Sequence, residues 1–184
     1  MFAFIFGGAI SGSVENYLPV LIPGILAQTA LTVCMATGVQ LREDMDKGVF
    51  DRFKSLPIAR FAPLAGPMIA DLLRYGIASV LTLLTGLAIG YRPGGGVAGC
   101  VAGIALTVVS GWSLAWIFSW LGTLARSAQA VQGYSMMIMF PLTFLSNAFV
   151  PAETLPDWLE AFVRVNPVSH VVSAVRALFN EGAV

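Results

Sequence analysis

Long apolar runs separated by short polar segments are the main pattern along this chain. A transmembrane helix needs about 20 predominantly apolar residues, and residues 18–40, 68–90, 97–124 and 128–150 each form a run of that kind. Residues 2–10 are also apolar but too few to cross a bilayer alone, so we expect them to be the outer end of a span whose beginning is absent. The pattern predicts an all-α, polytopic integral membrane protein with about five membrane segments.

Proline positions refine the first and last of the complete runs. Pro19 and Pro23 lie near one end of the run at residues 18–40, and we expect them in the first helical turn, where proline is tolerated. Pro141 lies inside the run at residues 128–150, and it predicts a kink there.

Basic residues in the connections predict the orientation of the spans. The longest connection, residues 41–67, carries five of them, namely Arg42, Lys47, Arg52, Lys54 and Arg60. Positively charged loops of membrane proteins stay in the cytoplasm. We therefore expect a multi-pass protein of the cell membrane, with residues 41–60 in the cytoplasm and the chain after Pro151 outside.

The same connection contains a predicted amphipathic helix at residues 41–56. Its apolar residues are spaced three or four apart, and they are Leu41, Met45, Val49, Phe53 and Leu56, with Phe50 beside them. Pro57 ends the pattern. Two interpretations stay open: a helix lying on the bilayer, although such helices are usually rich in Lys and Arg, or a docking helix that inserts Phe50 and Phe53 into a groove of a partner protein.

Composition agrees with a lipid environment and narrows the function. Hydrophobic residues make up 57% of the 184 residues and charged residues 11%, against about 25% charged in soluble domains. A net charge of zero, without a long basic tract, argues against nucleic acid as a partner. The sequence contains no Walker motif Gly-x-x-x-x-Gly-Lys-Ser/Thr and no catalytic constellation, and His170 has no second metal ligand near it. We expect no catalytic site, metal or cofactor.

Some polar and aromatic residues within the spans are candidates for ligand contact. Trp112, Trp116 and Trp120 form a stripe at a spacing of four residues, which could stack on a flat hydrophobic ligand or pack between helices. Gln132 and Met136 could contribute to the same path, although polar groups in spans more often form interhelical hydrogen bonds. The possible substrate path therefore comprises Trp112, Trp116, Gln132 and Met136.

Asp71 and Arg74 form an ionisable pair near the expected cytoplasmic end of the run at residues 68–90. An ionisable residue in a span is a functional candidate by default. A spacing of three residues lets these two side chains neutralise each other on one helix face. We favour a structural pair that fixes the position of its helix at the membrane surface.

Two long stretches of the sequence resemble a known family. The stretch EDMDKGVFDRFKSLPIARFAPLAGPMIADLLR is similar to the cytoplasmic loop of type 2 ABC transporter permeases, in particular the daunorubicin-resistance type. The matching residues are Gly48, the DRFKSLP run at 51–57, Arg60, Gly66, Asp71 and Arg74. The stretch NAFVPAETLPDWLEAFVRVNPVSHVVSAVRAL resembles the segment after the fifth span of that family. FGGAI and YLPVLIPGILAQT near the start are similar too, whereas Pro67 stands where the family often has arginine.

The resemblance implies a single permease domain over residues 1–184, truncated at both ends because the family has six spans. It implies that the loop helix is a coupling helix that binds a separate ATPase subunit. The residues of that helix which we expect to contact the partner are Glu43, Met45, Gly48, Val49, Phe50, Arg52, Phe53 and Leu56. The implied assembly pairs this chain with a second permease copy, as a homodimer in the lipid bilayer.

The implied activity is export of a hydrophobic, drug-like small molecule with energy from ATP hydrolysis in the partner subunit. Two short amphipathic segments, around residues 155–163 and 168–179, are expected to form re-entrant helices that close the outer end of the transport path. Asn166 and Pro167 separate them. Lipid or polysaccharide export within the same family, or an ATP-independent membrane scaffold or assembly protein, are the alternatives.

Overall fold

The structure is a computed structural model, and it describes residues 14–54, 62–144, 146 and 162–180. Every regular element in these ranges is a helix, as the sequence predicted. In chain order the main ones are α2 (Val14–Asp46), α3 (Val49–Lys54), α4 (Ala62–Ile89), α5 (Gly96–Leu124), α6 (Ala128–Phe144) and α8 (Pro167–Asn180), and residues 162–165 are also helical.

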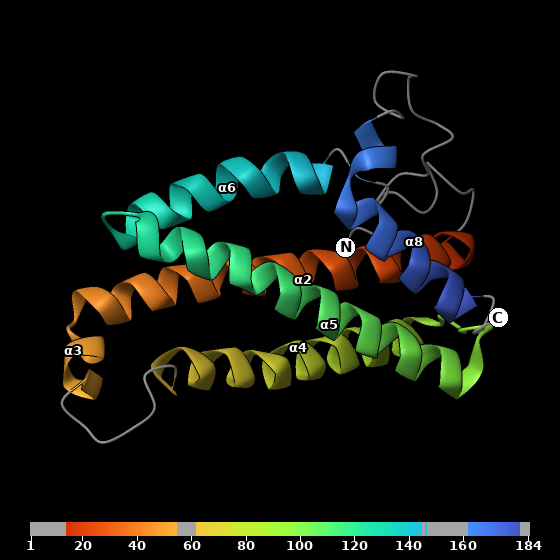
Figure 1. Ribbon diagram of the computed structural model, residues 1–184. Coiled ribbons are helices and arrows are strands. Elements are labelled where there is room, and N and C mark those ends of the chain that lie inside the picture. The colour runs from red at the N-terminus through yellow and green to blue at the C-terminus, as the bar shows by residue number, and fades with distance from the viewer. Residues whose placement is uncertain (1–13, 55–61, 145, 147–161, 181–184) are drawn as a thin grey trace.

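Helix α2 is the centre of the bundle. It contacts α4, α5, α6 and α8, and Figure 1 shows α4 and α6 on opposite sides of it. The short α3 lies at one end of the bundle, and α8 packs on α2 and α5 near the other end. We call these the α3 end and the α8 end.

Three of the helices are long and apolar enough to cross a membrane: Tyr17–Asp46, Ala65–Ile89 and Gly96–Leu124. They confirm three of the predicted spans. Of the run expected at residues 128–150, the structure describes a helix of 17 residues, α6. Residues 2–10 and 147–150 lie outside the described part of the chain.

The prolines of α2 lie inside the helix, so their expected place in the first turn is wrong. Helix α2 begins at Val14 and continues through Pro19 and Pro23. Because Pro23 has no backbone N–H, the Pro19 carbonyl loses its usual partner within the helix. The Asn180 side chain of α8 supplies a replacement, since its Nδ2 donates to the Pro19 carbonyl at 3.2 Å.

Asn180 also connects α8 to the turn between α4 and α5. Its Oδ1 accepts a hydrogen bond of 2.8 Å from the Tyr91 hydroxyl. Burial raises the pKa of Tyr91 to about 12, so this hydroxyl keeps its proton and stays a donor at neutral pH. One side chain thus joins three parts of the bundle at the α8 end.

The apolar face predicted at residues 168–179 is confirmed in α8. Val168, Val172, Val175 and Phe179 on this face are buried. Asn166 caps the helix, because its Oδ1 accepts a hydrogen bond of 2.9 Å from the Val168 backbone N–H. Of the other expected short helix, only the last residues, Phe162 and Val163, are described.

Candidate functional site

The predicted amphipathic helix at residues 41–56 is two helices rather than one. Nothing between Gln40 and Leu41 interrupts the span, so α2 continues to Asp46. Ion pairs four residues apart support its last turns: Arg42 with Asp46, and Lys47 with Glu43 at 3.1 Å. At 33 residues α2 is about 50 Å long. This exceeds a hydrocarbon core of about 30 Å, so the polar end of α2 lies beyond the apolar layer.

Gly48 makes the break. Its φ of +69° lies in the left-handed region, which suits glycine at the C-terminal cap of a helix. The Gly48 N–H donates to the Met45 carbonyl at 3.0 Å, and the chain then turns into α3. The expectation of one continuous apolar face fails because the 3.6-residue pattern carries no information about backbone handedness at a glycine.

The break divides the expected coupling residues between two helices. Glu43 and Met45 lie on α2, and Gly48 lies in the turn between α2 and α3, which we call the Gly48 corner. Val49, Phe50, Arg52 and Phe53 lie on α3, where the Phe53 side chain is 36% exposed. Leu56 lies outside the described residues. The described candidates are thus gathered at the α3 end of the bundle, which Figure 1 shows opposite α8.

Replacement of Gly48 by alanine should loosen this corner. A Cβ at Gly48 would meet no atom of the described residues within 4 Å, so the expected cost is conformational, about 1 kcal/mol for an L-residue in the left-handed region. That corresponds to about fivefold in an opening equilibrium. We expect faster hydrogen exchange of the α3 amides in Gly48→Ala, and less of an increase in Gly48→Asn, because asparagine tolerates this conformation.

Gly66→Ala is the matched control for the Gly48 corner. Gly66 lies in α4 without a positive φ, and a Cβ there would also be more than 4 Å from every atom of the described part of the chain. Alanine should therefore leave its helix as stable or more stable. Equal α3 exchange rates in Gly48→Ala and the unchanged protein would contradict the proposed role of the corner.

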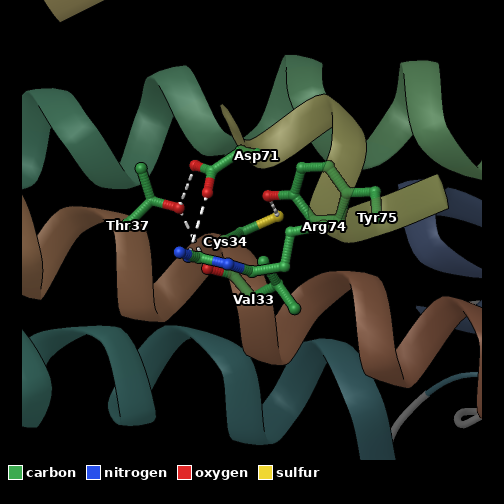
Figure 2. Close-up of polar contacts among 6 residues, drawn as sticks. All are labelled: Val33, Cys34, Thr37, Asp71, Arg74 and Tyr75. Carbon is green, nitrogen blue, oxygen red and sulfur yellow. Dashed lines mark hydrogen bonds and ion pairs between the residues drawn. The ribbon is translucent and has the colours of Figure 1, made fainter. Parts of the chain in front are cut away.

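The ionisable pair predicted at Asp71 and Arg74 is present and belongs to a larger polar cluster (Figure 2). Arg74 Nη1 lies 3.0 Å from Asp71 Oδ1. Asp71 is only 2% exposed, whereas the Arg74 side chain is 53% exposed. The Thr37 hydroxyl of α2 hydrogen-bonds the other carboxylate oxygen of Asp71. The pair therefore connects two helices as well as stabilising its own.

A second set of hydrogen bonds extends the cluster toward α5. The Tyr75 hydroxyl, one turn after Asp71 on α4, donates to Cys34 Sγ at 3.2 Å. Cys34 Sγ in turn donates to the Gly111 carbonyl of α5 at 3.1 Å. Tyr75 and Cys34 are both essentially buried, at 1% and 0% exposure. Polar side chains thus connect three membrane helices at one level of the bundle.

A cavity of about 190 Å³ lies against the cluster, between α2 and α4. Its lining comprises Thr37, Gln40, Asp44, Pro67, Ala70, Asp71 and Arg74. A more open hollow of about 310 Å³ lies on the other side of α2, toward α6. Its lining comprises Met35, Ala36, Val39, Gln40, Glu43 and Gln132. Gln40 therefore lies between two hollows, both toward the α3 end of α2.

The four residues of the possible substrate path lie in different surroundings. Trp112 packs against the buried cluster that contains Met68 and Tyr75 of α4. The Trp116 ring meets the Trp112 ring edge-to-face, with centroids 5.8 Å apart, and Trp116 is 45% exposed. Gln132 of α6 lines the hollow beside α2, and Met136, also on α6, is 50% exposed. The described structure places Gln132 in a hollow but brings the tryptophans into neither one.

Sequence reasoning missed the partners of the ionisable pair. Thr37, Cys34 and Tyr75 each look unremarkable in an apolar run. A signal did exist, because Cys34 and Thr37 are three residues apart on one span, and Asp71 and Tyr75 are four apart on another. Such spacings place each pair on one helix face, but only the packing of α2 on α4 shows that the two faces meet.

Comparison with known proteins agrees with this architecture. Residues 1–180 match the family described as ABC-2 type transporter. The chain is 43% identical over 180 residues to a daunorubicin resistance ABC transporter permease of Streptomyces coeruleorubidus. The aligned region covers 98% of this chain and 64% of that protein. No solved structure matches it significantly.

Two further relatives are more distant. A doxorubicin resistance ABC transporter permease of Mycobacterium tuberculosis is 29% identical over 94% of this chain and 60% of its own length. An inner membrane transport permease of Escherichia coli is 25% identical over 86% of this chain and 42% of its own length. The chain thus spans less than two thirds of the length of each of these relatives. With the family match over residues 1–180 and the helical membrane architecture, the chain belongs to the ABC-2 type transporter family.

Proposed function

We propose that this chain is the transmembrane permease subunit of an ABC exporter that moves a hydrophobic, drug-like small molecule out of the cell. The observation that carries the proposal is the 43% identity, over 98% of this chain, to a daunorubicin resistance permease. The Mycobacterium tuberculosis relative, a doxorubicin resistance permease, supports the same class of cargo. The lipid bilayer of the cell membrane is the environment in which we expect the protein to act.

A separate ATPase subunit supplies the energy, and the names of the relatives, which are permease proteins of ABC transporters, support this division of roles. We place the docking site of that subunit at α3 and the adjoining end of α2. Two observations support this location. A six-residue helix cannot be stable by itself in water, and its Phe53 leaves 36% of the side chain exposed. A groove on the partner would cover both Phe53 and the charged residues around it.

The cargo path forms between two copies of this permease, with α6 and the adjoining side of α2 as one part of its wall. The hollow beside Gln132 supports this placement, since the apolar residues Met35, Ala36 and Val39 line it together with Glu43. Met136 and Trp116, both about half exposed, offer flexible and flat apolar surfaces to a hydrophobic molecule.

Co-purification and ATP hydrolysis test the proposal. The permease, in the full length in which it is encoded, is produced together with the soluble ABC ATPase that we expect the neighbouring gene to encode. We expect a stable complex in detergent, and stimulation of ATP hydrolysis in vesicles by a flat aromatic drug such as daunorubicin. Absence of a complex would contradict the ATPase partnership. Stimulation by a lipid or a lipid-linked polysaccharide instead would favour that alternative cargo.

The orientation gives a separate prediction. Because basic residues concentrate around α3, we expect Lys47 to face the cytoplasm. The Lys47→Cys variant should resist a membrane-impermeant thiol reagent in intact cells and react after the cells are opened. The native cysteines should remain silent, since Cys34 and Cys100 are 0% and 9% exposed. Rapid labelling of position 47 in intact cells would overturn the assigned orientation.

A further inference from the structure

Helix α4 is attached to the bundle along a single stripe. Between residues 65 and 89 its buried residues are spaced three or four apart, and they are Met68, Asp71, Tyr75, Ser79, Leu83 and Gly86. The other side of the helix exposes large apolar side chains, among them Ile69 and Leu73 at 61% and 69%, as contact with lipid requires. Because the contact surface is narrow, a strong interaction within it contributes much of the attachment that makes α4 move with its neighbours.

Such a link exists at Thr37, Asp71 and Arg74, which we call the clasp (Figure 2). Asp71 binds Thr37 of α2 through one carboxylate oxygen and Arg74 of its own helix through the other. Because Asp71 is 98% buried, little water competes for these bonds. Arg74 balances the buried charge and, being half exposed, extends its guanidinium toward the surface.

The clasp lies equally far along both helices from the connection that carries α3. Thr37 precedes the end of α2 at Asp46 by nine residues, and Asp71 follows the start of α4 at Ala62 by nine residues. Nine residues of helix span about 13 Å. On the α3 side of the clasp, the 190 Å³ cavity separates Gln40 and Asp44 of α2 from α4. The clasp therefore connects α2 and α4 next to a region, toward the α3 end, where the cavity separates the two helices.

Next to the clasp, α2 is held firmly against α5. A Cβ on Gly38, the residue after Thr37, would lie 2.4 Å from the Phe118 carbonyl oxygen of α5. The two backbones are therefore in direct contact, which makes α2 and α5 one unit at this level. A clasp between α2 and α4 thus connects α4 to a body of at least two helices.

We propose that Thr37, Asp71 and Arg74 are positioning residues that make α4 move together with α2 and α5, so that a displacement of α3 reaches all three helices. The inference rests on the proposed function, because it assumes an ATPase that displaces α3. Without the clasp, α4 keeps only its apolar contacts and the Tyr75–Cys34 hydrogen bond and follows α2 less closely, so ATP hydrolysis proceeds with less movement of the cargo path. The clasp does not contact the ATPase, and its loss should leave docking intact.

Two variants open the clasp from opposite sides. Thr37→Val keeps the volume of the side chain and removes the hydroxyl, whereas Asp71→Leu removes both bonds and leaves the half-exposed Arg74 charge in contact with solvent. In the full-length permease with its ATPase, we expect normal co-purification and basal hydrolysis but loss of the stimulation by cargo. Thr29→Val is the matched control, because among the described residues the Thr29 hydroxyl bonds only to the Ile25 carbonyl of its own helix, at 2.8 Å.

A covalent bridge should replace the missing clasp. Gln40 and Ala70 lie on opposite walls of the cavity and are both exposed, so cysteines there can be joined by thiol-reactive bifunctional reagents of graded length. In Thr37→Val carrying Gln40→Cys and Ala70→Cys, we expect a bridge of suitable length to restore the stimulation by cargo. A role of the clasp in folding alone would not respond to a bridge added after folding.

The outcomes separate this inference from the proposed function. If the unchanged protein neither binds the ATPase nor responds to cargo, the proposed function fails, and the clasp's role fails with it. If the unchanged protein responds, the inference alone is overturned by normal stimulation in both clasp variants, by loss of ATPase binding in them, by an equal loss in Thr29→Val, or by a loss that no bridge restores.

Discussion

Replacement of Phe53 by aspartate is expected to abolish association with the ATPase subunit. Phe53 is on the six-residue α3, at the end of the bundle, with 36% of its side chain exposed. Docking would bury the ring in a partner groove, where an aromatic anchor contributes about 2 kcal/mol or more, which is at least about thirtyfold in affinity. A carboxylate there would be desolvated without a partner, which adds a further cost.

A graded series makes the Phe53 prediction specific to docking. Phe53→Leu keeps an apolar side chain of a different shape and should weaken association without abolishing it. Arg92→Ala is the control, because it removes an exposed charge from the turn between α4 and α5, at the opposite end of the bundle. The measurement is co-purification of the ATPase from detergent extracts with equal amounts of inserted permease. Undiminished association of Phe53→Asp would exclude α3 as the docking element.

The sequence was sufficient to predict the membrane helices but not where they begin and end. Apolar runs identify α2, α4 and α5 because lipid demands continuous apolar length. The prediction that Pro19 and Pro23 lie in the first turn was wrong, because a helix can continue through prolines when another helix supplies the lost hydrogen bond, as Asn180 does here. That compensation comes from a residue more than 150 positions away and leaves no local pattern.

The candidate site was predictable to a similar degree. The spacing of Asp71 and Arg74 was enough to predict their ion pair. Their connection to Thr37 depends on how α2 packs on α4 and could not be predicted from either run alone. At the α3 end, charge and amphipathicity located the exposed Phe53, but the left-handed φ of Gly48 divides the expected helix in two. Local sequence located the residues, and tertiary packing determined which of them act together.

The contact of α2 with α5 gives the second large expected effect, in stability. The buried residues of α5 are mostly small, and they are Gly99, Cys100, Gly103, Thr107, Gly111, Ala115, Phe118, Ser119 and Gly122. Small residues allow two membrane helices to approach closely, and that packing replaces the hydrophobic effect, which is absent between helices in lipid. At Gly38 and Gly122 the approach is so close that backbone touches backbone.

Gly122→Ala should therefore force α2 and α5 apart. Its Cβ would lie 2.6 Å from the Gly38 carbonyl oxygen, and a Cβ on Gly38 would lie 2.4 Å from the Phe118 carbonyl oxygen. Backbone atoms cannot rotate away as a side chain can, so the helices must separate and lose contacts along their length. Overpacking of this kind costs about 1–3 kcal/mol. The helix preference of alanine over glycine, about 1 kcal/mol, offsets part of that cost.

Other glycines of the bundle provide the controls for Gly122. A Cβ on Gly86 would meet the Ile22 side chain at 2.8 Å, and that side chain can change rotamer, so Gly86→Ala should cost less. A Cβ on Gly76 would meet no described residue within 4 Å, so Gly76→Ala should be neutral or stabilising. The measurement is thermal unfolding in detergent. It is monitored by the reaction of a thiol reagent with Cys34, which is fully buried one turn from Gly38. We expect the midpoint to fall most for Gly122→Ala, less for Gly86→Ala and not at all for Gly76→Ala; equal midpoints for the first and last would show that the two backbones are not in contact.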